Sequence, residues 1–178
     1  MMTVTGIWRT ARERTLLQVP ISSRLIKEKR QMKDENTAMS DILKRRVFNI
    51  HQGVTQIPYF KNLPCKIKDV DEGWVRVAFD ITPNLCNYRG IAAGGVLAAF
   101  CDTLMGMASR SLGYQVTTLE INMNYIRPVH PGQQLIGVGQ VVHHGGRTIV
   151  AECELMDENG KVVVKGRSSF YILRKYDD

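Results

Sequence analysis

The sequence predicts an α+β domain in which an antiparallel sheet of five to six strands curls around one long central helix. One observation is the apolar stretch IAAGGVLAAFCDTLMGMAS at residues 91–109, which is long enough for a helix and apolar on nearly every side. Another is the alternation of apolar and polar residues on either side of it, which is typical of strands. Short polar turns separate the later segments, so these strands should pair as an antiparallel meander.

Two strands are expected before the helix. They lie at Cys65–Val70 and Trp74–Ile81, and the sequence DEG at residues 71–73 should turn the chain between them. A polar loop follows at residues 82–90.

The central helix should run from Gly94 to about Leu112, where Gly113 ends it. Because its sequence is apolar nearly all round, we expect the whole helix to be buried. The same stretch approaches the length of a membrane span, but an aspartate near its middle would be costly in lipid, so no span is expected.

Four strands are expected after the helix, at Val116–Arg127, Gln134–His143, Thr148–Asp157 and Val162–Leu173. Each should pair with the next, through turns at residues 128–132, 144–146 and 157–160. In the first of these strands, simple alternation places Thr118 on the face of Glu120 and Asn122, opposite Leu119 and Ile121.

The N-terminal part divides the chain into residues 1–35, a basic and disordered extension, and 36–178, the folded domain. A helical pattern at residues 36–53 predicts a helical extension of that domain. Residues 1–31 hold seven Arg or Lys and two Glu, which accounts for most of the formal net charge of +7. The basic charge therefore gives little support to nucleic-acid binding, and no nucleic-acid partner is expected.

The four cysteines are widely spaced and form no metal-binding pattern, so we expect reduced thiols, no metal and a cytoplasmic location. No cofactor is expected either. The Arg-rich, acid-poor N-terminus is also a feature of mitochondrial presequences, which leaves the mitochondrial matrix as an alternative location.

Asp102 is the only charged residue between Ile91 and Ser109. A carboxylate in such apolar surroundings is costly unless it has a partner or a role, so Asp102 is a candidate general base or nucleophile. Gly94 and Gly95 would present free backbone N–H groups at the start of the helix, where negative charge is stabilised. The combination points to acyl transfer or hydrolysis.

Distance then requires a second chain. Gly94 and Asp102 are eight residues apart, which separates them by about 12 Å along a helix. An attacking water held by Asp102 and a carbonyl held by the glycine turn must lie within roughly 3 Å of each other. Two antiparallel helices across a two-fold axis satisfy this requirement, so we expect an obligate dimer with composite sites.

The motif NYRGIAAGG at residues 87–95, followed by Asp102 and by the strand end YIRP at residues 125–128, resembles the hotdog-fold acyl-CoA thioesterases of the PaaI-like subgroup. The turn Gly146-Arg147 and the last strand also match. The resemblance covers about residues 55–173. It implies a hotdog fold, an acyl-CoA substrate, and a homodimer or a dimer of dimers.

The resemblance also implies a role for individual residues. Gly94 matches the glycine that polarises the thioester carbonyl, and Asn87 matches the side chain that helps to hold the thioester. Asp102 matches the acid that activates water or attacks directly, and Thr118 matches the hydroxyl residue that assists the water, both from the partner chain. Ala93 stands where the family usually has histidine.

Three further residues are candidates for substrate binding. Arg127 and Arg147 could hold the phosphates of coenzyme A, because a guanidinium group suits phosphate. Gly95 adjoins the carbonyl-binding turn.

Purely structural roles are alternatives for several of these residues. Asp102 could be satisfied by backbone N–H groups or by Thr103 and Ser109, Asn87 could be a turn former, and the two glycines could serve close packing. For the whole chain, the alternative is a non-catalytic acyl-CoA sensor. A hotdog dehydratase is disfavoured, because those enzymes use a histidine and none lies near the helix.

Overall fold

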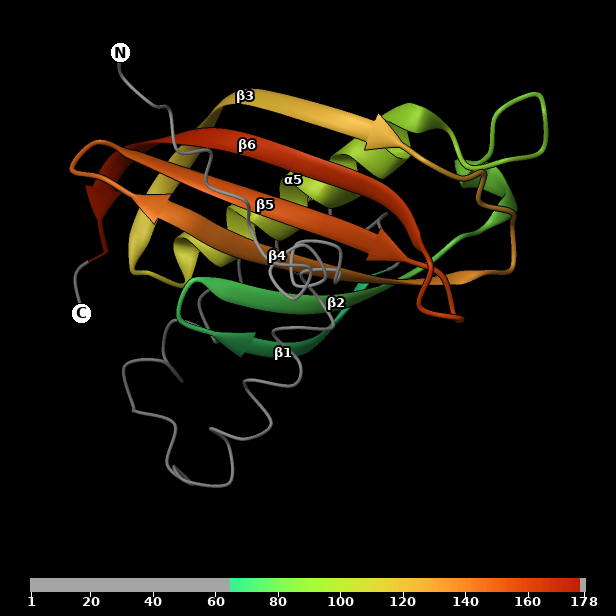
Figure 1. Cartoon of the computed structure of the whole chain (residues 1–178), viewed down its shortest axis with the longest axis horizontal. Helices are drawn as coiled ribbons and strands as arrows, with labels where there is room; N and C mark the ends of the chain where they lie inside the picture. Colours follow the sequence, from blue (N-terminus) through green and yellow to red (C-terminus); the bar gives the residue numbers. More distant parts are fainter. Residues whose placement is uncertain (1–64, 177–178) are drawn as a thin grey trace, which may run out of the picture. The chain divides into compact units, whose positions relative to one another are not determined.

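The computed structural model describes residues 65–176, so the expected basic extension and the helix at residues 36–53 lie outside the described residues. Within this range the chain forms one six-stranded antiparallel sheet and one long helix, α5, at Gly94–Arg110. Figure 1 shows α5 lying lengthwise against one face of the sheet. The predicted α+β architecture, with a sheet around a single helix, is confirmed.

The strands agree closely with the predicted segments. A short 3-10 turn, η1 at Pro83–Leu85, lies in the polar loop before the helix. The strands are β1 at Cys65–Asp71, β2 at Trp74–Asp80, β3 at Tyr114–Tyr125, β4 at Gln134–His144, β5 at Thr148–Met156 and β6 at Val162–Lys175.

The predicted pairing of all four later strands in one meander is wrong. The sheet order is β1-β2-β4-β5-β6-β3. Of the four later strands, β4, β5 and β6 therefore form a meander, whereas β3 lies at the edge beside β6. The connection from β3 to β4 is no hairpin turn, because it is fastened at both ends elsewhere. Ile126 donates its N–H to Val163 of β6 at 2.8 Å, and the carbonyl of Val129 accepts from Ala92 at 2.8 Å.

The predicted face of Thr118 is also wrong. The register shifts between Thr118 and Glu120, because Leu119 forms a bulge that has no partner on β6. An extra residue reverses the alternation beyond it. Thr118 pairs with Phe170, which is buried beneath the helix, and Ile121 pairs with the buried Ser168. Thr118 therefore shares the helix-facing side with Ile121, not with Glu120.

The helix is less buried than its composition predicts. Phe100, Leu104 and Ala108 on α5 are fully buried against the sheet. A stripe along the opposite side of the helix is exposed or half-buried, and it consists of Gly95, Ala98, Ala99, Asp102, Gly106 and Arg110. The expectation of a wholly buried helix fails because most residues of this stripe are small and look apolar in sequence. No helix among residues 65–176 is long and apolar enough to cross a membrane.

Glycines in β4 set the distance between α5 and the sheet. A Cβ atom at Gly139 would lie 2.6 Å from the backbone oxygen of Leu104, and one at Gly137 would lie 2.4 Å from the Leu104 side chain. Side chains at these positions would push the helix away from the strand. The helix can therefore pack deeply only because β4 has no side chains there.

We expect Gly139→Ala to lower the melting temperature, since its Cβ would meet backbone that cannot rotate away. Overpacking of this kind costs about 1–3 kcal/mol. Gly146→Ala is the matched control, because a Cβ there would meet nothing within 4 Å. Thermal unfolding of both variants measures the difference, and equal melting temperatures would contradict this account of the helix packing.

Candidate functional site

Asp102 is held by the neighbouring strand and not by its own helix. Thr118 on β3 donates its hydroxyl hydrogen to Asp102 Oδ1 at 2.9 Å. The hydroxyls of Thr103 and Ser109 donate instead to carbonyls four residues earlier in α5, at 2.7 and 2.8 Å. The alternative in which these two residues satisfy the aspartate is therefore wrong. Thr118 faces the helix because it pairs with the buried Phe170 on β6.

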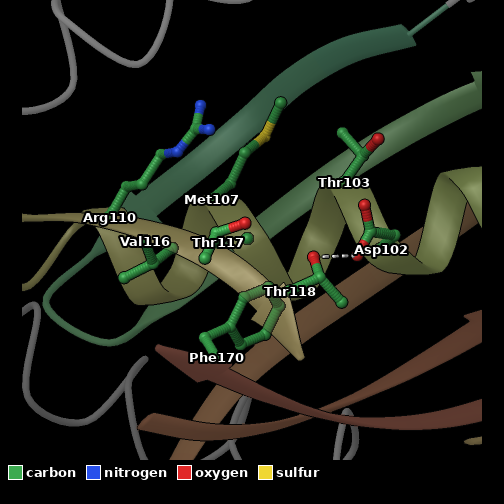
Figure 2. A pocket seen from close by; sticks show the side chains of 9 residues that line it. Asp102, Thr103, Met107, Arg110, Val116, Thr117, Thr118 and Phe170 are labelled. Carbon is green, nitrogen blue, oxygen red and sulfur yellow. Dashed lines mark hydrogen bonds between the residues drawn. The ribbon is translucent and has the colours of Figure 1, made fainter. Parts of the chain in front are cut away.

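Asp102 and Thr118 line a cavity of about 190 Å³ between α5, β3 and β6. Figure 2 shows their hydrogen bond at one end of this cavity and the side chain of Arg110 at the other. The side chains between them are mostly apolar or hydroxylated. The remaining lining residues are Thr103, Gly106, Met107, Val116, Thr117 and Phe170.

The start of α5 forms a second site. Ala93 is the N-cap and offers no side-chain cap, and Gly94 and Gly95 are exposed. Among the described residues no acceptor is found for the N–H groups of these two glycines. Tyr125 donates its hydroxyl hydrogen to the carbonyl of Gly94 at 3.0 Å, which fastens the first turn to β3. The helix start can thus receive an anionic oxygen.

A second cavity, of about 370 Å³, surrounds this helix start. Asn87, Gly94, Tyr125 and Arg127 all contribute to its lining. The Oδ1 atom of Asn87 accepts the N–H of Arg89 at 2.9 Å, so the residue does form the turn that its sequence context suggests. Asn87 also lines the cavity, so the turn-forming and substrate-binding interpretations are compatible.

The two cavities have no lining residue in common. One holds Asp102 and Thr118, and the other holds Gly94 and Asn87. Eight residues of helix separate Gly94 from Asp102, which corresponds to about 12 Å. The structure therefore brings the predicted residues together in two pairs and leaves the pairs apart within one chain.

The predicted phosphate-binding arginines differ in position. Arg127 lines the cavity at the helix start, and its guanidinium donates to the carbonyl of Val162. Arg147 is exposed in the turn between β4 and β5 and lines neither cavity. The two cavities therefore do not support the predicted role of Arg147 in binding a ligand within its own chain.

Sequence reasoning missed two residues of these cavities, Tyr125 and Arg110. Tyr125 belongs to the YIRP motif, but only the fold shows that its hydroxyl reaches the start of α5. Arg110 had a detectable signal, because it lies eight residues after Asp102 and so falls on the same side of a helix.

The chain is similar to known thioesterases in sequence and in fold. A family model described as the thioesterase superfamily matches residues 89–164. The acyl-coenzyme A thioesterase PaaI of Escherichia coli is 29% identical over 110 residues, which cover 61% of this chain and 79% of that protein. The solved structure of E. coli PaaI aligns with a TM-score of 0.72 at 23% identity, covering 78% of this chain and 99% of that one.

A hypothetical thioesterase from Streptococcus pneumoniae, solved with coenzyme A, aligns with a TM-score of 0.62 at 27% identity. The alignment covers 64% of this chain and 91% of that one. Two further structures of a hypothetical thioesterase from the same strain, with TM-scores of 0.61, carry alanine in place of an aspartate and of a threonine.

Cys101, next to Asp102 in sequence, belongs to the core. All four cysteines are free, and Cys101 and Cys153 are buried. A hydrogen bond with Cys153 and burial raise the pKa of Cys101 well above its ordinary value. The thiol is therefore protonated at neutral pH and is a poor nucleophile.

In the native protein at pH 8, iodoacetamide should modify the half-buried Cys86 well before Cys101. Mass spectrometry of peptides taken over time measures the order, and the same reaction in urea should label all four thiols. Rapid labelling of Cys101 in the folded protein would contradict its assignment to the core.

Proposed function

Since this chain belongs to the thioesterase superfamily and has its hotdog fold, we propose that it hydrolyses acyl-coenzyme A thioesters to a free acid and coenzyme A. The observation that carries the proposal is the hydrogen bond of 2.9 Å between Thr118 and Asp102 at the end of a cavity. It fixes the only carboxylate of a largely apolar helix in a defined orientation, beside space for an acyl group.

The chemistry follows from the two oxygens of Asp102. Thr118 occupies Oδ1, and this leaves Oδ2 to take a proton from a water molecule as it attacks the thioester carbon. The carbonyl oxygen then becomes an anion, which the N–H of Gly94 stabilises; one such donor contributes about 2.7–4 kcal/mol in a comparable hydrolase. The carbon–sulfur bond breaks, and the proton on Asp102 passes to the departing thiolate.

The thioesterase structures from S. pneumoniae support these two roles. The aspartate and the threonine that were replaced there stand in the same order and at the same separation as Asp102 and Thr118. At the helix start, the amide of Asn87 would help to hold the thioester, and Arg127 in the same cavity would meet the phosphates of coenzyme A.

Two copies of the chain complete the site, with Gly94 of one copy beside Asp102 of the other. Two features of the described residues favour such a pair. β3 is an edge strand with both faces exposed over residues 117–122, including Leu119 at 60% exposure. The half-buried stripe of α5 has small residues around Asp102, which would allow a second helix to approach closely. An exposed apolar edge is also a liability for a monomer.

Replacing Asp102 tests the chemical role. We expect Asp102→Asn to lower kcat by roughly 10²–10⁴-fold, the usual contribution of a general base, with little change in melting temperature. Thiol release from short, medium, long and aromatic acyl-CoAs measures turnover. Glu152→Gln removes an equal charge at an exposed ion pair with Arg167, outside both cavities, and should remain active.

Unchanged turnover in Asp102→Asn would refute this mechanism. If the wild-type protein binds acyl-CoA but hydrolyses none of the panel, the non-catalytic sensor is the better description. Ala93, which stands where the family usually has histidine, would then be the first position to examine.

Mixed dimers test the composite site. Gly94→Pro removes the N–H donor at the first helical position, where proline is tolerated. Dimers of Asp102→Asn alone or of Gly94→Pro alone should be nearly inactive. After unfolding and refolding together, half of the dimers should be mixed and hold one intact site, which restores about a quarter of the wild-type activity. No recovery in verified mixed dimers would place both groups in one chain.

A further inference from the structure

Arg110 ends α5 and lines the cavity that holds Asp102. Its guanidinium forms no ion pair or hydrogen bond within the described part of the chain, and its Nε is buried without a hydrogen-bond partner. Buried donors in proteins are nearly always satisfied. The described residues supply no acceptor for this donor, and the cavity beside it has room for a ligand that does.

The positions of Arg110 and Asp102 give the cavity two distinct ends. Both residues lie on the same stripe of α5, and eight residues of helix place them about 12 Å apart. Figure 2 shows Asp102 at one end of the lining, Arg110 at the other, and Met107 on the same helix between them. Val116 and Phe170 add apolar surface to the lining.

These features describe the acyl group that the cavity suits. Its volume of about 190 Å³ is small beside the roughly 300–1,000 Å³ of typical ligand pockets, so a short acyl group fits. The Asp102 end would repel a negative charge, whereas the Arg110 end would attract one. The apolar walls suit a carbon chain between the two ends.

We infer that Arg110 selects short acyl groups that carry a carboxylate at the end distant from the thioester. The inference rests on the proposed thioester hydrolysis, since Asp102 must mark the carbonyl end. Arg110 is then a specificity residue, and its guanidinium binds the distal carboxylate through charge-assisted hydrogen bonds.

A structural role for Arg110 is the competing explanation. A cation at the C-terminal end of a helix stabilises the helix dipole, and this needs no ligand. The same dipole opposes an anion at this end, so a bound carboxylate would depend on the guanidinium. A structural role predicts equal effects on all substrates, whereas a specificity role predicts effects on anionic ones alone.

The test compares two acyl-CoAs of equal chain length that differ only at the distal end, glutaryl-CoA and valeryl-CoA. In the wild-type protein we expect the ratio of kcat/KM for glutaryl-CoA over valeryl-CoA to be at least ten. Arg110→Gln should lower that ratio by about tenfold to a hundredfold, as expected for the loss of a hydrogen bond to a charged group. Arg110→Lys should restore part of it.

Arg76→Gln is the matched control. Arg76 is also half-buried with an Nε that lacks a partner, but it lies on β2 outside the lining of either cavity. This control should leave the ratio unchanged. A wild-type ratio near or below one would overturn the inference, and so would an equal loss with both substrates in Arg110→Gln.

Binding separates this inference from the proposed function. Calorimetry with thioether analogues of the same two acyl-CoAs, which cannot be hydrolysed, reports selection of the distal group without turnover. Selective binding that depends on Arg110, without hydrolysis of either substrate, would uphold the specificity and refute the hydrolase. Hydrolysis of both substrates without selectivity in binding would uphold the hydrolase and refute the specificity.

Discussion

Because α5 is a rigid helix, it keeps Gly94 and Asp102 about 12 Å apart. This fixed distance separates the candidate site into two parts within one chain. α5 is packed against the sheet by fully buried side chains, and the missing side chains of Gly137 and Gly139 let it lie close to β4. Nothing in that packing allows the first turn to bend back toward Asp102. A carbonyl-binding turn and a catalytic acid on one such helix can act together only through a second copy.

The edge strand β3 has to serve both the fold and the site. Its pairing with the buried Phe170 of β6 turns Thr118 toward the helix, where the hydroxyl reaches Asp102, and the bulge at Leu119 reverses the alternation beyond it so that Tyr125 faces the same side. Farther along the same strand, Tyr125 reaches the carbonyl of Gly94. One strand therefore positions a residue in each of the two cavities, which couples the geometry of the acid to that of the helix start.

The sequence allowed the helix and the six strands to be predicted, because periodicity is a local property. The family resemblance implied that Asp102 and Thr118 act in one site, but their hydrogen bond is visible only in the structure. It did not predict that β3 joins β6, since this depends on how residues 126–133 are anchored to distant segments. The orientation of Thr118 was predicted from simple alternation, which a single bulged residue overturns. Arg110 was missed because a basic residue at a helix end has an ordinary structural explanation.

The exposed stripe of α5 combines small residues with a carboxylate, which leaves the acid poorly covered in a single chain. Gly95, Ala98, Ala99 and Gly106 give it no side chains large enough to cover the carboxylate of Asp102, which stays half-buried. Larger residues would shield the acid but would also keep a second helix at a distance. Small residues around a single acid are therefore consistent with a surface that is completed by another copy. Arg110 at the end of the same stripe lines the cavity that holds Asp102, where a bound acyl group can reach it.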